Sequence, residues 1–71
     1  MDTKIRLKLA QRIKRLRRKL GLTQEKLSEA SDIDYKYIQR IEGKNPPDIR
    51  LTTIVRLAKA LKVKPAELVK F

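Results

Sequence analysis

The chain has 71 residues and carries 19 lysines and arginines against eight aspartates and glutamates, which gives a formal net charge of +11. It contains no cysteine and no histidine, and no apolar run approaches the ~20 residues that a membrane span needs, so a disulfide framework, an ordinary zinc site and a membrane span are excluded. A single small domain over residues 1–71 is expected, and its charge predicts attraction to a polyanion, most commonly nucleic acid.

The N-terminal segment predicts a basic amphipathic helix over residues 3–20, which Gly21 ends as a glycine C-cap. Its apolar residues recur at intervals of three and four: Ile5, Leu9, Ile13, Leu16 and Leu20. Nine lysines and arginines stand in residues 1–20 against a single acid, Asp2. We expect this charge to lie beside the segment that follows and to attract a polyanion there.

Two short helices with the same start signal follow, one from a Thr23 cap to about Ser31 and one from an Asp34 cap to about Glu42. Apolar residues flank both caps with the spacing of a hydrophobic staple: Leu22 with Leu27, and Ile33 with Ile38. Asp32 occupies the corner between the helices, which requires a left-handed backbone. Two helices joined by so tight a turn are typical of a helix-turn-helix, the unit that lays its second helix in the major groove of DNA.

Two further helices complete the chain after a loop that contains Pro46 and Pro47. The fourth helix is expected from about Leu51 to Lys62, with Leu57 beside an apolar face of Leu51, Ile54, Val55, Ala58 and Leu61. The last is expected to begin at Pro65, after a poor cap at Lys64, and to end with the chain. No segment predicts a strand. The fold class is therefore all-α, a compact five-helix domain with a central helix-turn-helix that rests on the first, fourth and fifth helices.

Four segments of the chain add a family likeness to this pattern: Leu22-Thr-Gln-Glu-Lys-Leu27, Tyr37-Ile-Gln-Arg-Ile-Glu-Gly-Lys44, Asn45-Pro46 and Leu57-Ala-Lys-Ala-Leu61. Together they resemble the phage repressor and Cro type of DNA-binding domain, a family of bacterial transcriptional regulators. The resemblance covers about residues 8–70 and implies sequence-specific binding to double-stranded DNA. Restriction–modification controller proteins, antitoxins and small repressors share it. The chain departs from the family at Ser28 and Asp32, where alanine and glycine are common, and at Gly43, which follows Glu42 directly.

The exposed side of the third helix is the candidate for reading DNA bases. Ile38 and Ile41 point inward at a three-residue interval, which leaves four residues on the opposite side: Tyr35, Lys36, Gln39 and Arg40. The base-reading positions of the family match three of these, and Gln39 lies alongside. Arginine and lysine suit guanine, glutamine suits adenine, and a tyrosine ring can meet a thymine methyl group. A solvated helix face is the alternative for any one residue, whereas the set together favours base readout.

Five further residues are candidates for contacts with the DNA backbone. Gln24 comes first in the second helix, whose N-terminal N–H groups favour an anion, and the matching family residue contacts a phosphate. Tyr37 has two alternatives, since its ring can lie on the edge of the core or its hydroxyl can donate to a phosphate. Lys44 and Asn45, just after the third helix, and Arg50, before the fourth, are the remaining candidates.

Arg17 and Glu42 match an arginine–glutamate ion pair that joins the first helix to the third in the family. Arg17 stands four residues before Gly21, and Glu42 stands immediately before Gly43. If it is buried, such a pair positions the recognition helix on its scaffold, and removal of one partner strands a charge.

A homodimer on a palindromic operator is also implied, because one small helix-turn-helix reads only a few base pairs and family members bind half-sites about one helical turn apart. The apolar residues near the end of the chain cannot all face one small core and form the candidate dimer surface: Leu68, Val69 and Phe71. Fraying of the C-terminus is the alternative explanation for them.

Other classes of function fit the sequence less well. The carboxylates are scattered, and nothing forms a catalytic pair or a phosphate-cradling loop, so no enzyme, metal site or cofactor is expected. The first helix has no Trp or Phe on its apolar face, and that face is needed for the core, which argues against membrane association. A protein-binding adaptor, above all an antitoxin that holds a toxin partner, is the remaining alternative. The favoured interpretation is a cytoplasmic regulator that occludes or contacts RNA polymerase at a promoter.

Overall fold

Five α-helices and no strand make up residues 3–71, the part of the chain that the computed structural model describes. They are α1 (Thr3–Lys19), α2 (Gln24–Ser31), α3 (Tyr35–Ile41), α4 (Leu51–Ala60) and α5 (Pro65–Leu68). The all-α, five-helix fold is confirmed. Asp2, the acid noted at the N-terminus, lies outside the described residues. The fourth helix ends earlier than expected, and α5 stops before the end of the chain.

The helix-turn-helix begins both of its helices with the caps that the sequence predicts. The Thr23 side chain accepts a hydrogen bond from the Lys26 backbone N–H at 3.0 Å, and the Asp34 carboxylate accepts one from the Lys36 N–H at 3.2 Å. Each cap satisfies a backbone donor that the first helical turn leaves without a partner, which stabilises a helix by about 1 kcal/mol. Helices of eight and seven residues depend on such caps and on tertiary packing.

The corner between α2 and α3 has the left-handed backbone that was expected at Asp32, with φ 57° and ψ 38°. Ser28 stabilises this corner, because its hydroxyl donates to the Ile33 carbonyl oxygen at 2.5 Å, while the Ile33 N–H donates to the Ser28 carbonyl at 3.2 Å. The two departures from the family pattern therefore act together: a serine hydroxyl adds a bond across a corner that is built without glycine. Gly21, with φ +72°, ends α1 as predicted.

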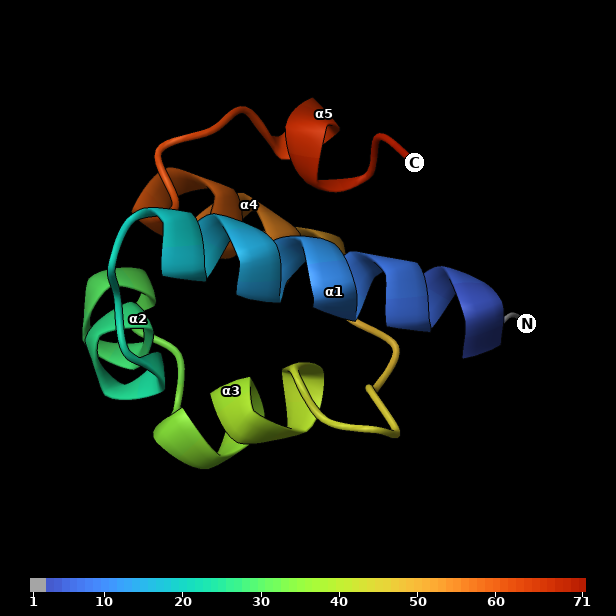
Figure 1. Cartoon of the computed structure of the whole chain (residues 1–71), viewed down its shortest axis with the longest axis horizontal. Helices are drawn as coiled ribbons and strands as arrows, with labels where there is room; N and C mark the ends of the chain where they lie inside the picture. Colours follow the sequence, from blue (N-terminus) through green and yellow to red (C-terminus); the bar gives the residue numbers. More distant parts are fainter. Residues whose placement is uncertain (1–2) are drawn as a thin grey trace.

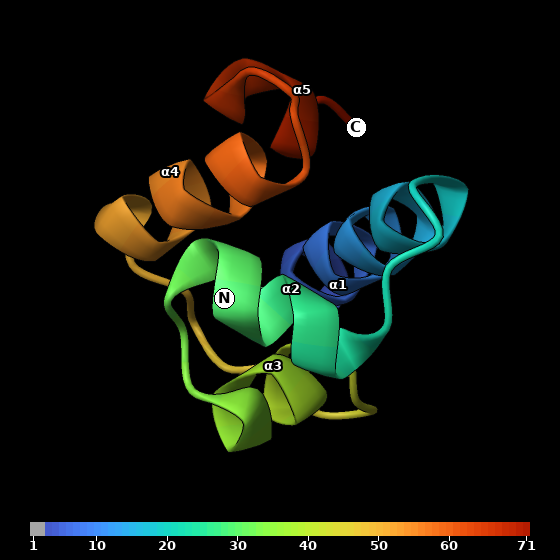
Figure 2. The same ribbon diagram turned by 90° about the vertical axis from the view of Figure 1, so that its left-hand side faces the viewer.

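The core takes side chains from every helix. The largest fully buried residues are Ile13, Leu27, Ile38, Ile41, Leu57, Leu61 and Leu68. Figure 1 shows α1 crossing the molecule with α5 on one side and α3 on the other, and Figure 2 shows α2 lying between α3 and α4. The helix-turn-helix thus contributes to the core as well as resting on it, and this fixes α3 relative to α1 and α4.

The expected apolar face of α4 is partly wrong. Leu51 is 73% exposed and Val55 is 45% exposed, although both were placed in the core. Leu57, placed beside the face, is fully buried instead, together with Ala58 and Leu61. The core contacts of α4 are centred nearer to Leu57, so that Leu51 and Val55 fall on a flank of the helix. They form an exposed apolar strip one helical turn long.

Within the described residues, no helix combines the length and the apolar character needed to cross a membrane.

Candidate nucleic-acid interface

The outer face of α3 presents four polar side chains to solvent, all of which were the sequence-based candidates for base contacts: Tyr35, Lys36, Gln39 and Arg40. The opposite side of the helix is fixed, because Ile38 and Ile41 are completely buried. On the outer face the Gln39 amide nitrogen donates to the Tyr35 hydroxyl oxygen at 3.2 Å. The helix therefore offers donors and acceptors of several kinds from a rigid support, which is the arrangement that base readout needs.

Tyr37 lies at the border between this face and the core. Its ring is partly buried and packs against the core cluster, and the Arg40 guanidinium carbon lies 5.9 Å from the ring centroid. This places the ring on the edge of the core, one of the two alternatives for Tyr37. The contact also holds Arg40 over an aromatic face, which restricts the orientations of the guanidinium group.

A buried, bidentate ion pair joins α1 to the end of α3. Arg17 Nε donates to Glu42 Oε2 at 2.7 Å, and Arg17 Nη2 donates to Glu42 Oε1 at 2.9 Å. The third nitrogen of the guanidinium group, Nη1, donates to the carbonyl oxygen of Leu22 at 2.6 Å. The side chains of Arg17 and Glu42 are only 10% and 1% exposed, so the pair is desolvated on both sides. One guanidinium group thus ties together α1, the chain entering α2 and the C-terminal end of α3.

Gln24 belongs to the same network, which sequence reasoning missed. Its amide nitrogen donates to Glu42 Oε1 at 3.1 Å, so a residue at the start of α2 contacts the end of α3. A side-chain amide nitrogen carries two hydrogens, and one remains for a phosphate acceptor. The bond therefore orients Gln24 at the N-terminal end of α2 and leaves the predicted phosphate contact open.

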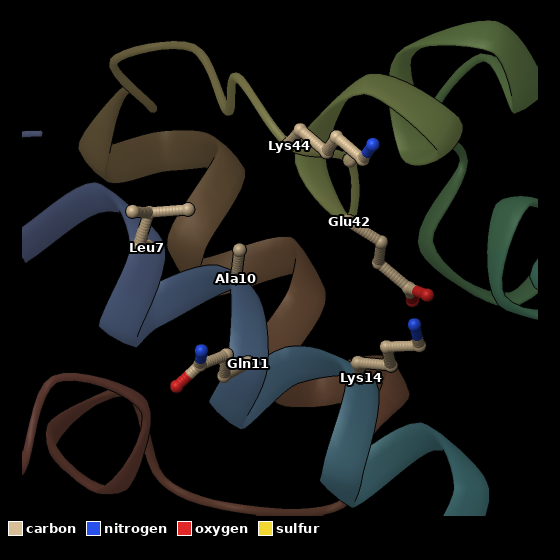
Figure 3. Close-up of a pocket in the computed structure, with 7 residues that line it drawn as sticks. Leu7, Ala10, Gln11, Lys14, Glu42 and Lys44 are labelled. Atoms are coloured by element: carbon tan, nitrogen blue, oxygen red, sulfur yellow. The ribbon is translucent and has the colours of Figure 1, made fainter. Parts of the chain in front are cut away.

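A pocket of about 240 Å³ lies between α1 and the segment that follows α3. Figure 3 shows its wall, with Leu7, Ala10 and Lys14 projecting from α1 on the side of Glu42 and Lys44. Lys14 was not among the sequence-based candidates. Its spacing was a usable signal, since residue 14 lies three positions before Arg17 and therefore shares a flank of α1 with it. Lys14 and Lys44 make this side of the domain positive.

The remaining candidates for backbone contacts lie in the loop between α3 and α4. Lys44, Asn45 and Arg50 are exposed, while Pro46 is buried and Ile49 packs against the core. The two apolar residues anchor the loop and hold Lys44 and Asn45 at the end of α3. Arg50 is the N-cap of α4 and makes no side-chain capping bond there.

The basic residues of α1 do not all lie beside the helix-turn-helix, in contrast to the expectation. Lys14 lies on the flank of α1 that faces the end of α3. Lys8, Arg12 and Arg15 lie on another flank, where they line a pocket with residues from the C-terminal end. Because successive residues of a helix are rotated by about 100°, a run of adjacent lysines and arginines is divided between faces.

The candidate dimer surface at the C-terminus needs one correction. Leu68 is completely buried in the core and is wrong as a surface residue, because α5 packs on α4 and α1 through it. Val69 and Phe71 are 46% and 55% exposed. The apolar end is therefore divided: one residue closes the core, and two face solvent.

Comparison with known proteins adds to this geometry. A family model described as helix-turn-helix matches residues 13–68. The crystal structure of the restriction–modification controller protein C.AhdI from Aeromonas hydrophila is similar with a TM-score of 0.83 and 36% sequence identity, over 89% of this chain and 94% of that one. A search of curated proteins finds no match.

Two further solved structures resemble the chain. One is a point mutant of the restriction–modification controller protein C.Esp1396I, with a TM-score of 0.86 and 28% identity over 96% of this chain and 85% of the other. The second is a hypothetical transcription factor, NHTF, from Neisseria, with a TM-score of 0.87 and 30% identity over 99% and 80% of the two chains. The likeness extends over nearly the whole domain, so it includes the placement of α2 and α3.

Proposed function

The chain belongs to the helix-turn-helix family of phage repressor and Cro type, whose members are DNA-binding transcriptional regulators, and from that premise we propose that it reads a specific double-stranded operator as a homodimer. In this proposal α3 lies in the major groove. The observation that carries the proposal is the outer face of α3, because the opposite side of this helix is completely buried. Four side chains able to read bases are exposed on the outer face: Tyr35, Lys36, Gln39 and Arg40.

Backbone contacts set the register of α3 in the groove. Gln24 donates to a phosphate from the N-terminal end of α2, where the free backbone N–H groups also favour an anion. Lys44, Asn45 and Arg50 contact phosphates from the loop after α3, and the Tyr37 hydroxyl adds a donor at the edge of the groove. The network of Arg17, Gln24 and Glu42 supports this function because it connects a phosphate-contacting residue directly to the end of the reading helix. The bound regulator then occludes or contacts RNA polymerase.

Nuclear magnetic resonance tests this docking mode. When a short duplex that contains the operator is added in equimolar amount, we expect the amide resonances of residues 24–26 and 35–45 to shift most. The resonances of residues 61–65, between α4 and α5, serve as the internal control and should change little. Shifts confined to other surfaces, with α3 unaffected, would contradict the placement of α3 in the groove.

The homodimer requires an apolar surface, and two places that each expose a neighbouring pair of apolar side chains are the candidates. One is the C-terminal end, with Val69 and Phe71; the other is the flank of α4, with Leu51 and Val55. We favour the α4 flank for two reasons. Leu51, at 73%, is the most exposed of the large apolar side chains. Phe71, in contrast, shares a pocket with four cations. In a two-fold dimer formed at that point, the cations of one subunit would face and repel those of the other.

Substitution of each surface separates these alternatives. Leu51→Glu is expected to turn the dimer into a monomer by placing two carboxylates at the apolar contact, whereas Phe71→Glu should leave the dimer intact. Sedimentation velocity over a range of protein concentrations measures both. Dissociation by Phe71→Glu alone would assign the interface to the C-terminal end, and a wild-type protein that stays monomeric on operator DNA would refute the dimer itself.

A further inference from the structure

A second group of positive side chains lies on the flank of α1 that faces away from α3. Lys8, Arg12 and Arg15 of α1, together with Lys70, line a pocket of about 170 Å³ that Gln11 and Phe71 complete. We call these four cations the outer basic cluster. The pocket on the α3 side is lined from α1 by Leu7, Ala10, Gln11 and Lys14 instead, so the two sites share only Gln11 among their lining residues. Figure 1 shows α1 between α3 and α5. The cluster lies on the α5 side, because Arg12 bonds the Glu67 carbonyl oxygen and the pocket is completed by residues that follow α5.

Among residues 3–71, no carboxylate forms an ion pair with the outer basic cluster. The α1 helix contains no acidic residue, and the ion pairs found among residues 3–71 are Arg17 with Glu42 and Lys26 with Glu29. Lys8 and Arg12, four positions apart, and Arg12 and Arg15, three apart, therefore repel each other. Cations are stabilised in the last turn of a helix, which accounts for the positions of Arg17, Arg18 and Lys19. This effect does not account for the positions of Lys8 and Arg12, which lie earlier in α1.

One member of the cluster is held in place. Arg12 Nε donates to the backbone carbonyl oxygen of Glu67 at 2.5 Å, a bond that connects α1 to α5. Both terminal nitrogens of the guanidinium group make no hydrogen bond within the described chain, so they form a fixed fork suited to a phosphate. Lys8, Arg12 and Arg15 span about 10 Å along the helix axis, which equals the axial rise of about three base pairs of a DNA duplex.

We propose that the outer basic cluster binds the phosphate backbone of a second DNA duplex, so that one domain holds two duplexes at once. The duplex read by α3 does not supply these phosphates, because the cluster lies on the α5 flank of α1, rotated by about 100–160° around the helix axis from Lys14 on the α3 side. The contact is to backbone only, since no side chain of the cluster lies on an element that enters a groove. A regulator with this surface joins its operator to a distant or neighbouring segment of DNA.

Titration with a short duplex in excess, followed by nuclear magnetic resonance, tests the cluster directly. We expect a second set of shifts at residues 8–15 and 70–71, with weaker affinity and a steeper loss at high salt than the shifts of α3. The two-duplex proposal rests on the proposed function: shifts at the cluster without any response of α3 would refute both, and would show a single duplex held by its backbone at the cluster. If the α3 resonances respond to the duplex and those of the cluster do not, the proposal is overturned. An acidic protein surface would then be the alternative partner of the cluster.

Two double variants then test whether the cluster bridges duplexes. Lys8→Gln with Arg15→Gln removes two cations of the cluster, and Arg56→Gln with Lys62→Gln removes two exposed cations outside it as the matched control. The readout is capture of a labelled duplex by protein already bound to immobilised operator. We expect roughly tenfold less capture by the cluster variant, a salt slope smaller by about 1.8, and unchanged binding of the first duplex. Equal capture by both double variants, or no capture by the wild-type protein, would overturn the proposal.

Discussion

Replacing Arg17 with alanine is expected to lower the free energy of unfolding by ~3–5 kcal/mol, because it leaves the Glu42 carboxylate buried without its charged partner. The Glu42 side chain is 1% exposed and receives two hydrogen bonds from Arg17, and Gln24 supplies only one more. The Leu22 carbonyl oxygen also loses its donor. A domain of this size has a total stability of the same order, so the variant should be largely unfolded at moderate temperature.

Thermal unfolding followed by circular dichroism measures the effect, with a fall in Tm of more than about 12 °C expected. Arg18→Ala is the matched control, since it removes the same charge from the next position of α1, where the side chain is exposed. Equal melting temperatures for the two variants would show that the ion pair does not hold α1, α2 and α3 together. That result would also remove the structural basis for a fixed recognition helix.

Arg40→Ala is expected to weaken binding to the operator by ~1–3 kcal/mol, which is about 5- to 150-fold, while binding to random duplex changes little. A guanidinium group that bonds a guanine edge contributes to the preferred sequence alone, whereas a phosphate contact contributes to every sequence. Arg40 is exposed on the outer face of α3 and is restrained by the Tyr37 ring, so it is suited to the first role.

Fluorescence anisotropy at fixed salt, with operator and scrambled duplexes in parallel, measures this difference. Arg56→Ala on α4 is the control, because it removes an exposed arginine outside the proposed interface. A loss of affinity by Arg40→Ala that is the same for operator and scrambled duplex would show that Arg40 contacts only the backbone.

The local features of the helix-turn-helix were predictable from sequence because their causes are local. Thr23 and Asp34 accept bonds from N–H groups two or three residues away, and the left-handed Asp32 closes a turn of a few residues. Inward-pointing Ile38 and Ile41 likewise determine, by helical spacing alone, which side of α3 is exposed. The family resemblance added the partners Arg17 and Glu42, which are 25 positions apart and which no local pattern connects.

The errors concern which flank of an amphipathic helix its neighbours cover. Leu51 and Val55 fit the apolar spacing of α4, yet the packing of α2 and α5 against the helix buries the side around Leu57. Leu68 was grouped with Val69 and Phe71 because the three cannot all face one small core, and the structure inserts Leu68 alone. The bond from Gln24 to Glu42 and the division of the basic residues of α1 also depend on tertiary placement, which sequence spacing does not specify.

Selection of binding sites from a random duplex DNA library at near-physiological salt tests the central claim most directly. We expect enrichment of a palindrome whose half-sites lie about one helical turn apart, as two copies of α3 related by a two-fold axis require. The enriched sequence would itself be the operator. Enrichment of no sequence, with binding that disappears as salt rises, would contradict base readout by α3 and show that the positive charge of the domain holds phosphates alone.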